Sequence, residues 1–252
     1  MRRLGTGWKV QMKDLFRRYL VVVMMLVMAL GMAACSAGEA EEAAGADPLS
    51  ADPYRWNKLF KEYRNDAEVN QLVFVAGKAG SEAEMFLYVK DPEDNTWNRE
   101  LETRCYVGKN GIGDASYCAN ITPEGVYGAS TAFGIKKNPG TTMPYCDFNN
   151  DNLYCCGCQD SEYYNQLIDV SKVKHEDCEG EHVIDYSPEY NYGMFLDYNS
   201  ENDPEEDFAI FFHCEGMKEF TGGCIAVPEY AMKEILKKCD SNVKVCIYRR
   251  GE

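Results

Sequence analysis

The first 35 residues carry an export signal, and that signal decides the chemical conditions in which the rest of the chain folds. Basic residues precede an apolar stretch from Leu20 to Met32, which ends in Ala33-Ala34-Cys35. This order is typical of a secretory signal peptide. We therefore expect residues 1–34 to be a signal peptide and the folded part to lie outside the cytoplasm, where thiols oxidise.

Cys35 resembles the lipid-modified cysteine of bacterial lipoproteins, so we expect a membrane anchor through a lipid at this residue. An uncleaved apolar anchor is the alternative, and it leaves the domain on the same side of the membrane. Residues 35–53 are rich in Ala, Glu and Gly and have few large apolar side chains, which predicts a flexible tether. Residues 54–252 suit one folded domain.

The chain has 12 cysteines, and outside the cytoplasm most cysteines form disulfides. We set Cys35 apart for lipidation and Cys224 apart as a candidate nucleophile. The remaining cysteines are even in number, as full pairing requires: Cys105, Cys118, Cys146, Cys155, Cys156, Cys158, Cys178, Cys214, Cys239 and Cys246. We expect a disulfide-rich domain, and the sequence does not assign which cysteines pair with one another.

The chain is acidic, with 26 Lys and Arg against 41 Asp and Glu. The part beyond the signal peptide is more acidic still, because the leader is basic. A negative surface argues against nucleic acid and anionic lipid headgroups as partners. It is also typical of a protein kept soluble by its charge.

Apolar runs with β-branched residues predict a mainly-β domain with a few helices. Strands are expected at 71–76, 84–90, 103–107, 125–133, 183–185, 192–198, 208–212 and 243–248. Helices are expected at 54–66, at 161–170 and from Pro228 onward. The first of these rests on Trp56, Leu59, Phe60 and Tyr63, which recur at helical spacing.

The segment from His213 to Cys224 carries the parts of a nucleophilic site. His213 follows an apolar run, and Gly222 and Gly223 stand immediately before Cys224. Glycines leave their N–H groups unshielded, so with the Cys224 N–H they could form an oxyanion hole. A histidine nearby can lower the thiol pKa. The residues alone leave open that Cys224 is a disulfide cysteine and His213 a core histidine.

The same segment resembles the L,D-transpeptidase catalytic domain family (YkuD-like), which carries a histidine, a loop and then Ser/Thr-x-Gly-Cys, with Thr221 here at the first position. Further motifs of one branch of that family follow in order along the chain. They are Val107-Gly-Lys-Asn110-Gly111, Thr122-Pro123-Glu124-Gly125, Ala132-Phe133-Gly134, Met143-Pro144-Tyr145 and Tyr164-Asn165. The resemblance spans roughly residues 70 to 249.

The resemblance implies a β-sandwich or barrel-like fold and cysteine acyl transfer on peptidoglycan stem peptides. Cys224 would form a thioester by releasing a terminal D-alanine, and an amine or water would resolve it, giving a transpeptidase or an L,D-carboxypeptidase. His213 would be the base, oriented by the Cys214 carbonyl. Gly222 and Gly223 would supply oxyanion contacts, and Thr221 would help to position substrate. No cofactor and no metal are implied.

The chain departs from the family pattern at several places, among them the segment from Asp114 to Asn120 before the Thr-Pro motif. Ala226 stands where many members have an arginine, and Cys214 where many have glycine. The cluster Cys155-Cys156-Gly-Cys158 has no counterpart, and it fits either a disulfide framework or, with His175 or Cys178, a zinc site. A non-catalytic, disulfide-stabilised lipoprotein that binds the cell wall is a further alternative, and it requires Cys224 to be oxidised.

Overall fold

The computed structural model describes residues 53–173 and 180–250, all within one compact unit of the chain. The expected signal peptide, the lipidated Cys35 and most of the tether lie outside the described residues. So do His175 and Cys178, the two residues considered for completing a zinc site.

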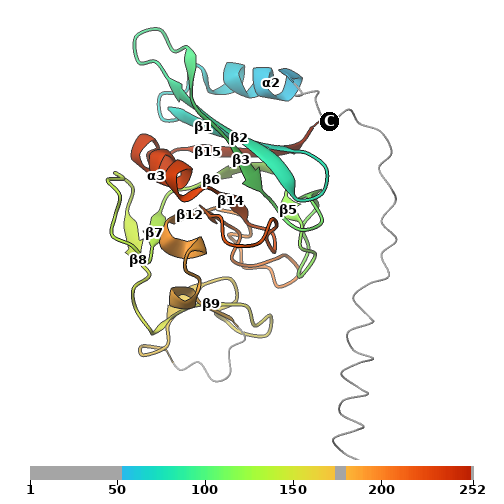
Figure 1. The fold of residues 1–252 in the computed structure, drawn as a ribbon, viewed down its shortest axis with the longest axis vertical. Coiled ribbons are helices and arrows are strands. Elements are labelled where there is room, and N and C mark those ends of the chain that lie inside the picture. Colours follow the sequence, from blue (N-terminus) through green and yellow to red (C-terminus); the bar gives the residue numbers. More distant parts are fainter. Residues whose placement is uncertain (1–52, 174–179, 251–252) are drawn as a thin grey trace, which may run out of the picture. The chain divides into compact units, whose positions relative to one another are not determined.

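One sheet of ten strands forms most of the domain (Figure 1). In spatial order its strands are β6 (Gly125–Gly128), β15 (Lys244–Arg249), β1 (Gln71–Gly77), β2 (Glu82–Lys90), β3 (Trp97–Tyr106), β14 (Ile225–Val227), β13 (Phe211–Cys214), β12 (Gly193–Phe195), β7 (Ala132–Gly134) and β8 (Tyr145–Asp147). Smaller sheets pair β10 (Leu167–Asp169), β9 (Leu153–Cys156) and β11 (Gly180–His182), and β4 (Ile112–Gly113) with β5 (Thr122–Pro123). The mainly-β prediction is confirmed.

Helices cover the sheet on both faces. They are α2 (Pro53–Tyr63), α3 (Glu229–Lys238) and the short 3-10 helices η1 (Val183–Asp185) and η2 (Glu189–Asn191). Lys237 and Lys238 lie in the last turn of α3, where positive charge complements the helix dipole. Within the described ranges, no helix is long and apolar enough to cross a bilayer.

Strand β1 is buried on both faces, because its alternating side chains enter two different clusters. Val73 and Val75 enter a central core that also contains the buried face of α3. Leu72 and Phe74 pack on the other face with Leu59 of α2, and Figure 1 shows α2 beside β1 and β2. We call this second set the α2 cluster: Leu59, Val69, Leu72, Phe74, Ala76, Phe86 and Cys246, with Trp56, Phe60, Tyr63, Tyr88 and Trp97 against it.

A third cluster lies around the candidate nucleophile, and we call it the Cys224 cluster. Its buried members are Phe133, Phe148, Cys155, Val183, Tyr190, Ala209, Phe211 and Cys224. It brings together parts of the chain as distant as β7 and β13, so its composition depends on the sheet topology.

Three local predictions were wrong. Residues 161–170 form turns and strand β10 because Asn165 has a left-handed backbone, with φ 58°. Residues 183–185 form η1. The strand expected at 208–212 begins only at Phe211, because Ala209 interrupts the extended backbone with φ 52°.

Seven of the described cysteines do not form the disulfides that the sequence led us to expect. Free thiols are present at Cys105, Cys146, Cys155, Cys214, Cys224, Cys239 and Cys246. Cys105 lies in the central core and Cys246 in the α2 cluster, so the sheet separates these two thiols. Buried among apolar side chains, they act as small hydrophobic residues.

Candidate active site

The sheet places His213 and Cys224 on neighbouring parallel strands. In the pairing of β13 with β14, His213 lies opposite Ala226, and Phe212 lies opposite Ile225. Cys224 comes immediately before β14, two residues from Ala226. Because side chains alternate along a strand, Cys224, Ala226 and His213 project to the same side of the sheet. All three line one cavity of about 320 Å³.

The Cys224 thiol is buried and held by main-chain groups. Its S–H donates to the Ala209 carbonyl (3.1 Å), and the Phe211 N–H donates to its sulfur (3.2 Å). Within the described part of the chain, no hydrogen bond joins this thiol to His213. Burial raises the pKa of Cys224, and the negative charge of Glu181 raises it further. The thiol is therefore protonated at rest.

His213 is held in one orientation by the backbone. Its Nδ1 lies 2.8 Å from the Cys214 carbonyl, which can only accept, so Nδ1 carries the proton and Nε2 is the free acceptor. Burial lowers the pKa of His213 to about 4, against the opposing effect of that hydrogen bond. The histidine is therefore neutral at pH 7 and able to accept a proton. This contact is the one that the family resemblance implies for Cys214.

Two threonines hold the loop before Cys224. The buried Thr122 hydroxyl lies 2.8 Å from the Gly223 carbonyl and accepts the Gly108 N–H, which links the Thr-Pro motif to the loop. The Thr221 hydroxyl donates to the Cys224 carbonyl (2.7 Å). Thr221 also lines the cavity. Its role in positioning substrate, which the family resemblance implies, stays a prediction. These contacts fix the direction of the peptide groups beside the nucleophile.

The two loop glycines differ in whether their surroundings could accept a side chain. Gly223 has φ 155°, and a Cβ there would come within 2.7 Å of Ile210. Its N–H already donates to the Thr221 hydroxyl (3.2 Å). Gly222 has open space around a Cβ. In the described part of the chain, the N–H groups of Gly222 and Cys224 donate to no protein group, so they are better placed than that of Gly223 to bind an oxyanion.

The Tyr164-Asn165 motif supports the carbonyl that holds the thiol. The Asn165 side-chain carbonyl accepts the Ala209 N–H (2.9 Å), and the Tyr164 hydroxyl donates to the Glu206 carbonyl (2.6 Å). These bonds keep Ala209 in its left-handed conformation, which is unfavourable for alanine. A motif distant in sequence thus positions the partner of Cys224.

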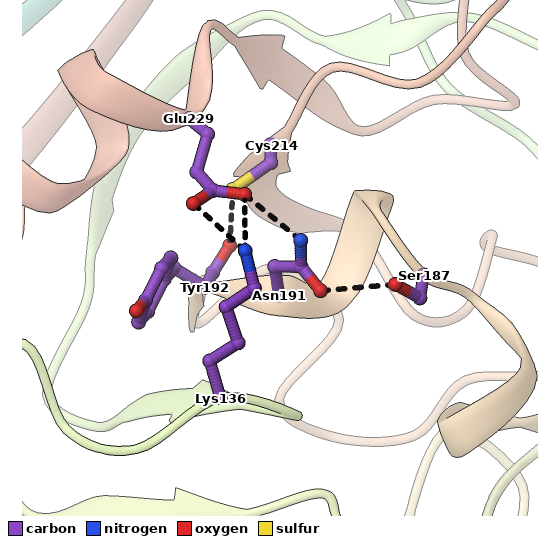
Figure 2. Close-up of polar contacts among 6 residues, drawn as sticks. All are labelled: Lys136, Ser187, Asn191, Tyr192, Cys214 and Glu229. Carbon is purple, nitrogen blue, oxygen red and sulfur yellow. Dashed lines mark hydrogen bonds and ion pairs between the residues drawn. The ribbon is translucent and has the colours of Figure 1, made fainter.

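A polar network reaches Cys214, the neighbour of His213 in β13 (Figure 2). Glu229, at the start of α3, accepts from Lys136 (2.9 Å) and from the Asn191 side chain (2.8 Å). The Cys214 thiol donates to the Tyr192 carbonyl (3.4 Å). This network joins η2 to α3 through Asn191, and it joins Tyr192, the residue after η2, to the strand that carries His213.

An acidic residue that sequence reasoning missed faces the same cavity. Glu181, in β11, lines the cavity and accepts the Tyr190 hydroxyl. The Tyr190 ring meets the His213 ring edge to face, with centroids 5.4 Å apart. Burial raises the pKa of Glu181 to about 7, although the bond from Tyr190 opposes this and Asp207 adds to it. Its sequence neighbours are polar and acidic, so nothing local distinguishes it.

Other sequence candidates lie elsewhere or remain without a role. The His182 ring stacks on Tyr154 (4.4 Å) and contacts Asp185, away from the cavity. Cys155 is buried in the Cys224 cluster. Across the described residues, no group of three or more His, Cys, Asp or Glu side chains is arranged to hold a metal ion.

Comparisons with known proteins give a distant likeness only. No family model matches the chain, and no curated protein matches it. Among solved structures, it is similar to the helical cell shape determining protein Pgp2 from Campylobacter jejuni, at 13% identity and a TM-score of 0.39, over 78% of this chain and 56% of that one. The K307A mutant of the same protein matches at 16% identity and a TM-score of 0.40, over 78% and 55%. The chain thus spans little more than half the length of these structures.

Proposed function

We propose that this chain is an extracytoplasmic cysteine acyltransferase that acts on peptidoglycan stem peptides. Cys224 takes up the acyl group as a thioester, the terminal D-alanine leaves, and an amine of a second stem receives the acyl group. The observation that supports this most is the shared cavity of Cys224 and His213, in which the imidazole Nε2 is left as an acceptor. Of the segments that resemble the L,D-transpeptidase family, the one from His213 to Cys224 lines this cavity.

The reaction starts from a neutral thiol and a neutral imidazole. The thiol proton leaves the Ala209 carbonyl and passes to His213 Nε2 as the sulfur attacks the substrate carbonyl. The oxyanion is held by the N–H groups of Gly222 and Cys224. The C–N bond then breaks, and His213 returns the proton to the departing D-alanine amine.

The second half repeats these roles in reverse. The acceptor amine gives a proton to His213 as it attacks the thioester, and the C–S bond breaks. The released thiolate recovers the proton from His213. Water in place of the amine gives L,D-carboxypeptidase action at the same thioester.

The non-catalytic alternative requires Cys224 in a disulfide. The free Cys224 thiol favours the enzyme over that alternative. Ala226 leaves the floor of the cavity beside His213 without the arginine that many family members have, so a substrate carboxylate needs another contact. Lys218 lines the same cavity and is the residue we assign to it.

The test uses full-length protein and purified tetrapeptide muropeptides. We expect D-alanine release, a mass adduct on Cys224 and crosslinked dimers. Cys224→Ala should lower the rate of D-alanine release at least a thousandfold, as loss of a covalent nucleophile does. A Cys224→Ala protein with unchanged activity, or Cys224 found in a disulfide in active protein, rules the proposal out. Monomeric tripeptides as the only products assign the carboxypeptidase instead.

A further inference from the structure

The cavity beside Cys224 carries more negative than positive charge. Its described acidic lining residues are Glu181, Glu189 and Asp207, against the single ammonium of Lys218. Asp207 is occupied, since its carboxylate accepts the Phe208 N–H (3.0 Å). The Lys218 ammonium lies over the Phe220 ring (5.7 Å). A substrate that binds here meets an excess of carboxylate close to the nucleophile.

Glu181 is the carboxylate best placed to contact a ligand. Its Oε2 accepts one hydrogen bond, from Tyr190, whose side chain is only 2% exposed. Across the described residues Oε1 has no protein partner, and no lysine or arginine forms an ion pair with this carboxylate. The rigid tyrosine therefore aims an acceptor into the cavity without neutralising it.

We propose that Glu181 recognises the side-chain ammonium of the acyl-donor peptide, which makes it a specificity-determining residue of the reaction proposed for Cys224. This inference rests on the proposed function and adds the group that selects the donor. Tyr190 is its positioning residue, because it holds the carboxyl and packs on His213.

Recognition at Glu181 also acts on the nucleophile. After burial, the charge of Glu181 is the next largest cause of the raised pKa of Cys224. An ammonium paired with this carboxylate cancels that charge and makes thiol ionisation easier. A donor with the amine is therefore both held and attacked more readily than one without it.

The experiment compares two synthetic donors that differ by one ammonium. They are L-Ala-γ-D-Glu-L-Lys-D-Ala and the same peptide with norleucine in place of lysine. With the full-length protein, we expect kcat/KM for D-alanine release to be at least tenfold higher for the lysine peptide. Glu181→Gln should lower the lysine value by about 10- to 100-fold and leave the norleucine value within about threefold, since a charged hydrogen bond is lost.

Asp185→Asn is the matched control, because it removes one carboxylate nearby in sequence and outside the cavity. It should leave the preference intact. Equal rates for the two peptides in the wild type, or an equal fall for both in Glu181→Gln, overturn the assignment. If Glu181→Gln slows only transfer to an added amine, the carboxylate serves the acceptor, which also overturns it.

A binding measurement separates this inference from the proposed function. Calorimetry on Cys224→Ala protein, with Glu181 intact, should show the lysine peptide binding at least tenfold more tightly than the norleucine peptide. If the wild type forms no thioester, the proposed function fails, and the binding ratio still decides the role of Glu181. Equal affinities rule that role out.

Discussion

The α2 cluster and the Cys224 cluster are both built from stacked aromatic rings, yet they differ in what else they bury. In the α2 cluster, Trp56 stacks on Phe74 with centroids 4.7 Å apart, and the Trp97 N–H donates to the Phe60 carbonyl. In the Cys224 cluster, Phe133 stacks on Phe148 at 4.4 Å, but the neighbouring groups include an acidic side chain, a histidine and two thiols. The α2 cluster is a core of aromatic rings, whereas the Cys224 cluster lies among titratable groups whose pKa values are shifted by burial.

The largest effect on stability should come from the α2 cluster. Phe74 is fully buried between Trp56, Phe60 and Tyr88. Phe74→Ala should lower the free energy of unfolding by about 3–5 kcal/mol. At 10 °C, below the lowered melting temperature, the rate of Cys224 acylation should stay within about threefold of wild type. Loss of acylation in protein still folded by circular dichroism would show that the two clusters are coupled.

Two substitutions in the loop beside Cys224 should show how much stability depends on the backbone conformation and close packing of Gly223. Gly223→Ala forces an L side chain to adopt φ 155°, so it should cost about 1–3 kcal/mol and displace the Cys224 N–H. Gly222→Ala is the control, because its Cβ meets no atom within 4 Å, and it should change stability by less than about 1 kcal/mol. Urea unfolding of both variants checks this, and equal losses would contradict it.

Much of the α2 region follows from local sequence, and much of the site does not. Trp56, Leu59 and Phe60 at helical spacing predict α2 within a few residues, because that helix needs only an apolar stripe and a sheet face. The sequence singles out His213 and Cys224 as candidates because their motif is local.

Glu181 and Asn165 depend on long-range pairing. Glu181 reaches the cavity through the pairing of β11 with β9, which no local pattern near it indicates. The helix expected at 161–170 failed because Asn165 bonds to Ala209, 44 residues away. Strand register and such contacts are set by the whole fold, so sequence periodicity does not predict them.

A pH comparison should show that Glu181, next to the Cys224 cluster, lowers the stability of the fold when it is charged. The pKa of Glu181 is raised to about 7 in the folded state, against about 4.3 unfolded. Above pH 7 this partly buried carboxylate is charged and destabilises the fold, whereas near pH 4.5 it is largely protonated and costs little. Glu181→Gln should therefore raise stability by about 1–3 kcal/mol at pH 8 and by much less at pH 4.5.

Thermal unfolding at the two pH values measures this effect. Tyr190, Cys155 and Cys224 face Glu181, and burial raises the pKa of each so far that they stay protonated at both pH values. Asp207 also faces Glu181, and it is unchanged in the variant. An equal effect at both pH values would show that the gain is not due to the buried charge.

The smallest change in unfolding free energy is expected from Ala209→Gly, which tests the backbone strain at Ala209. Glycine adopts a left-handed backbone without the steric cost that alanine meets, but it loses more entropy on folding, so Ala209→Gly should stabilise by no more than about 1 kcal/mol. Ala231→Gly, in the ordinary helical backbone of α3, should instead destabilise by about 1 kcal/mol or more. Urea unfolding of both variants checks that the two changes in stability have opposite signs.

The same variant also tests the nucleophile. Because the Ala209 carbonyl holds the thiol, a more mobile residue 209 should slow Cys224 acylation by a few fold even though the free energy of unfolding rises. A variant that is both less stable and equally active would mean that the left-handed residue serves the fold and not the nucleophile.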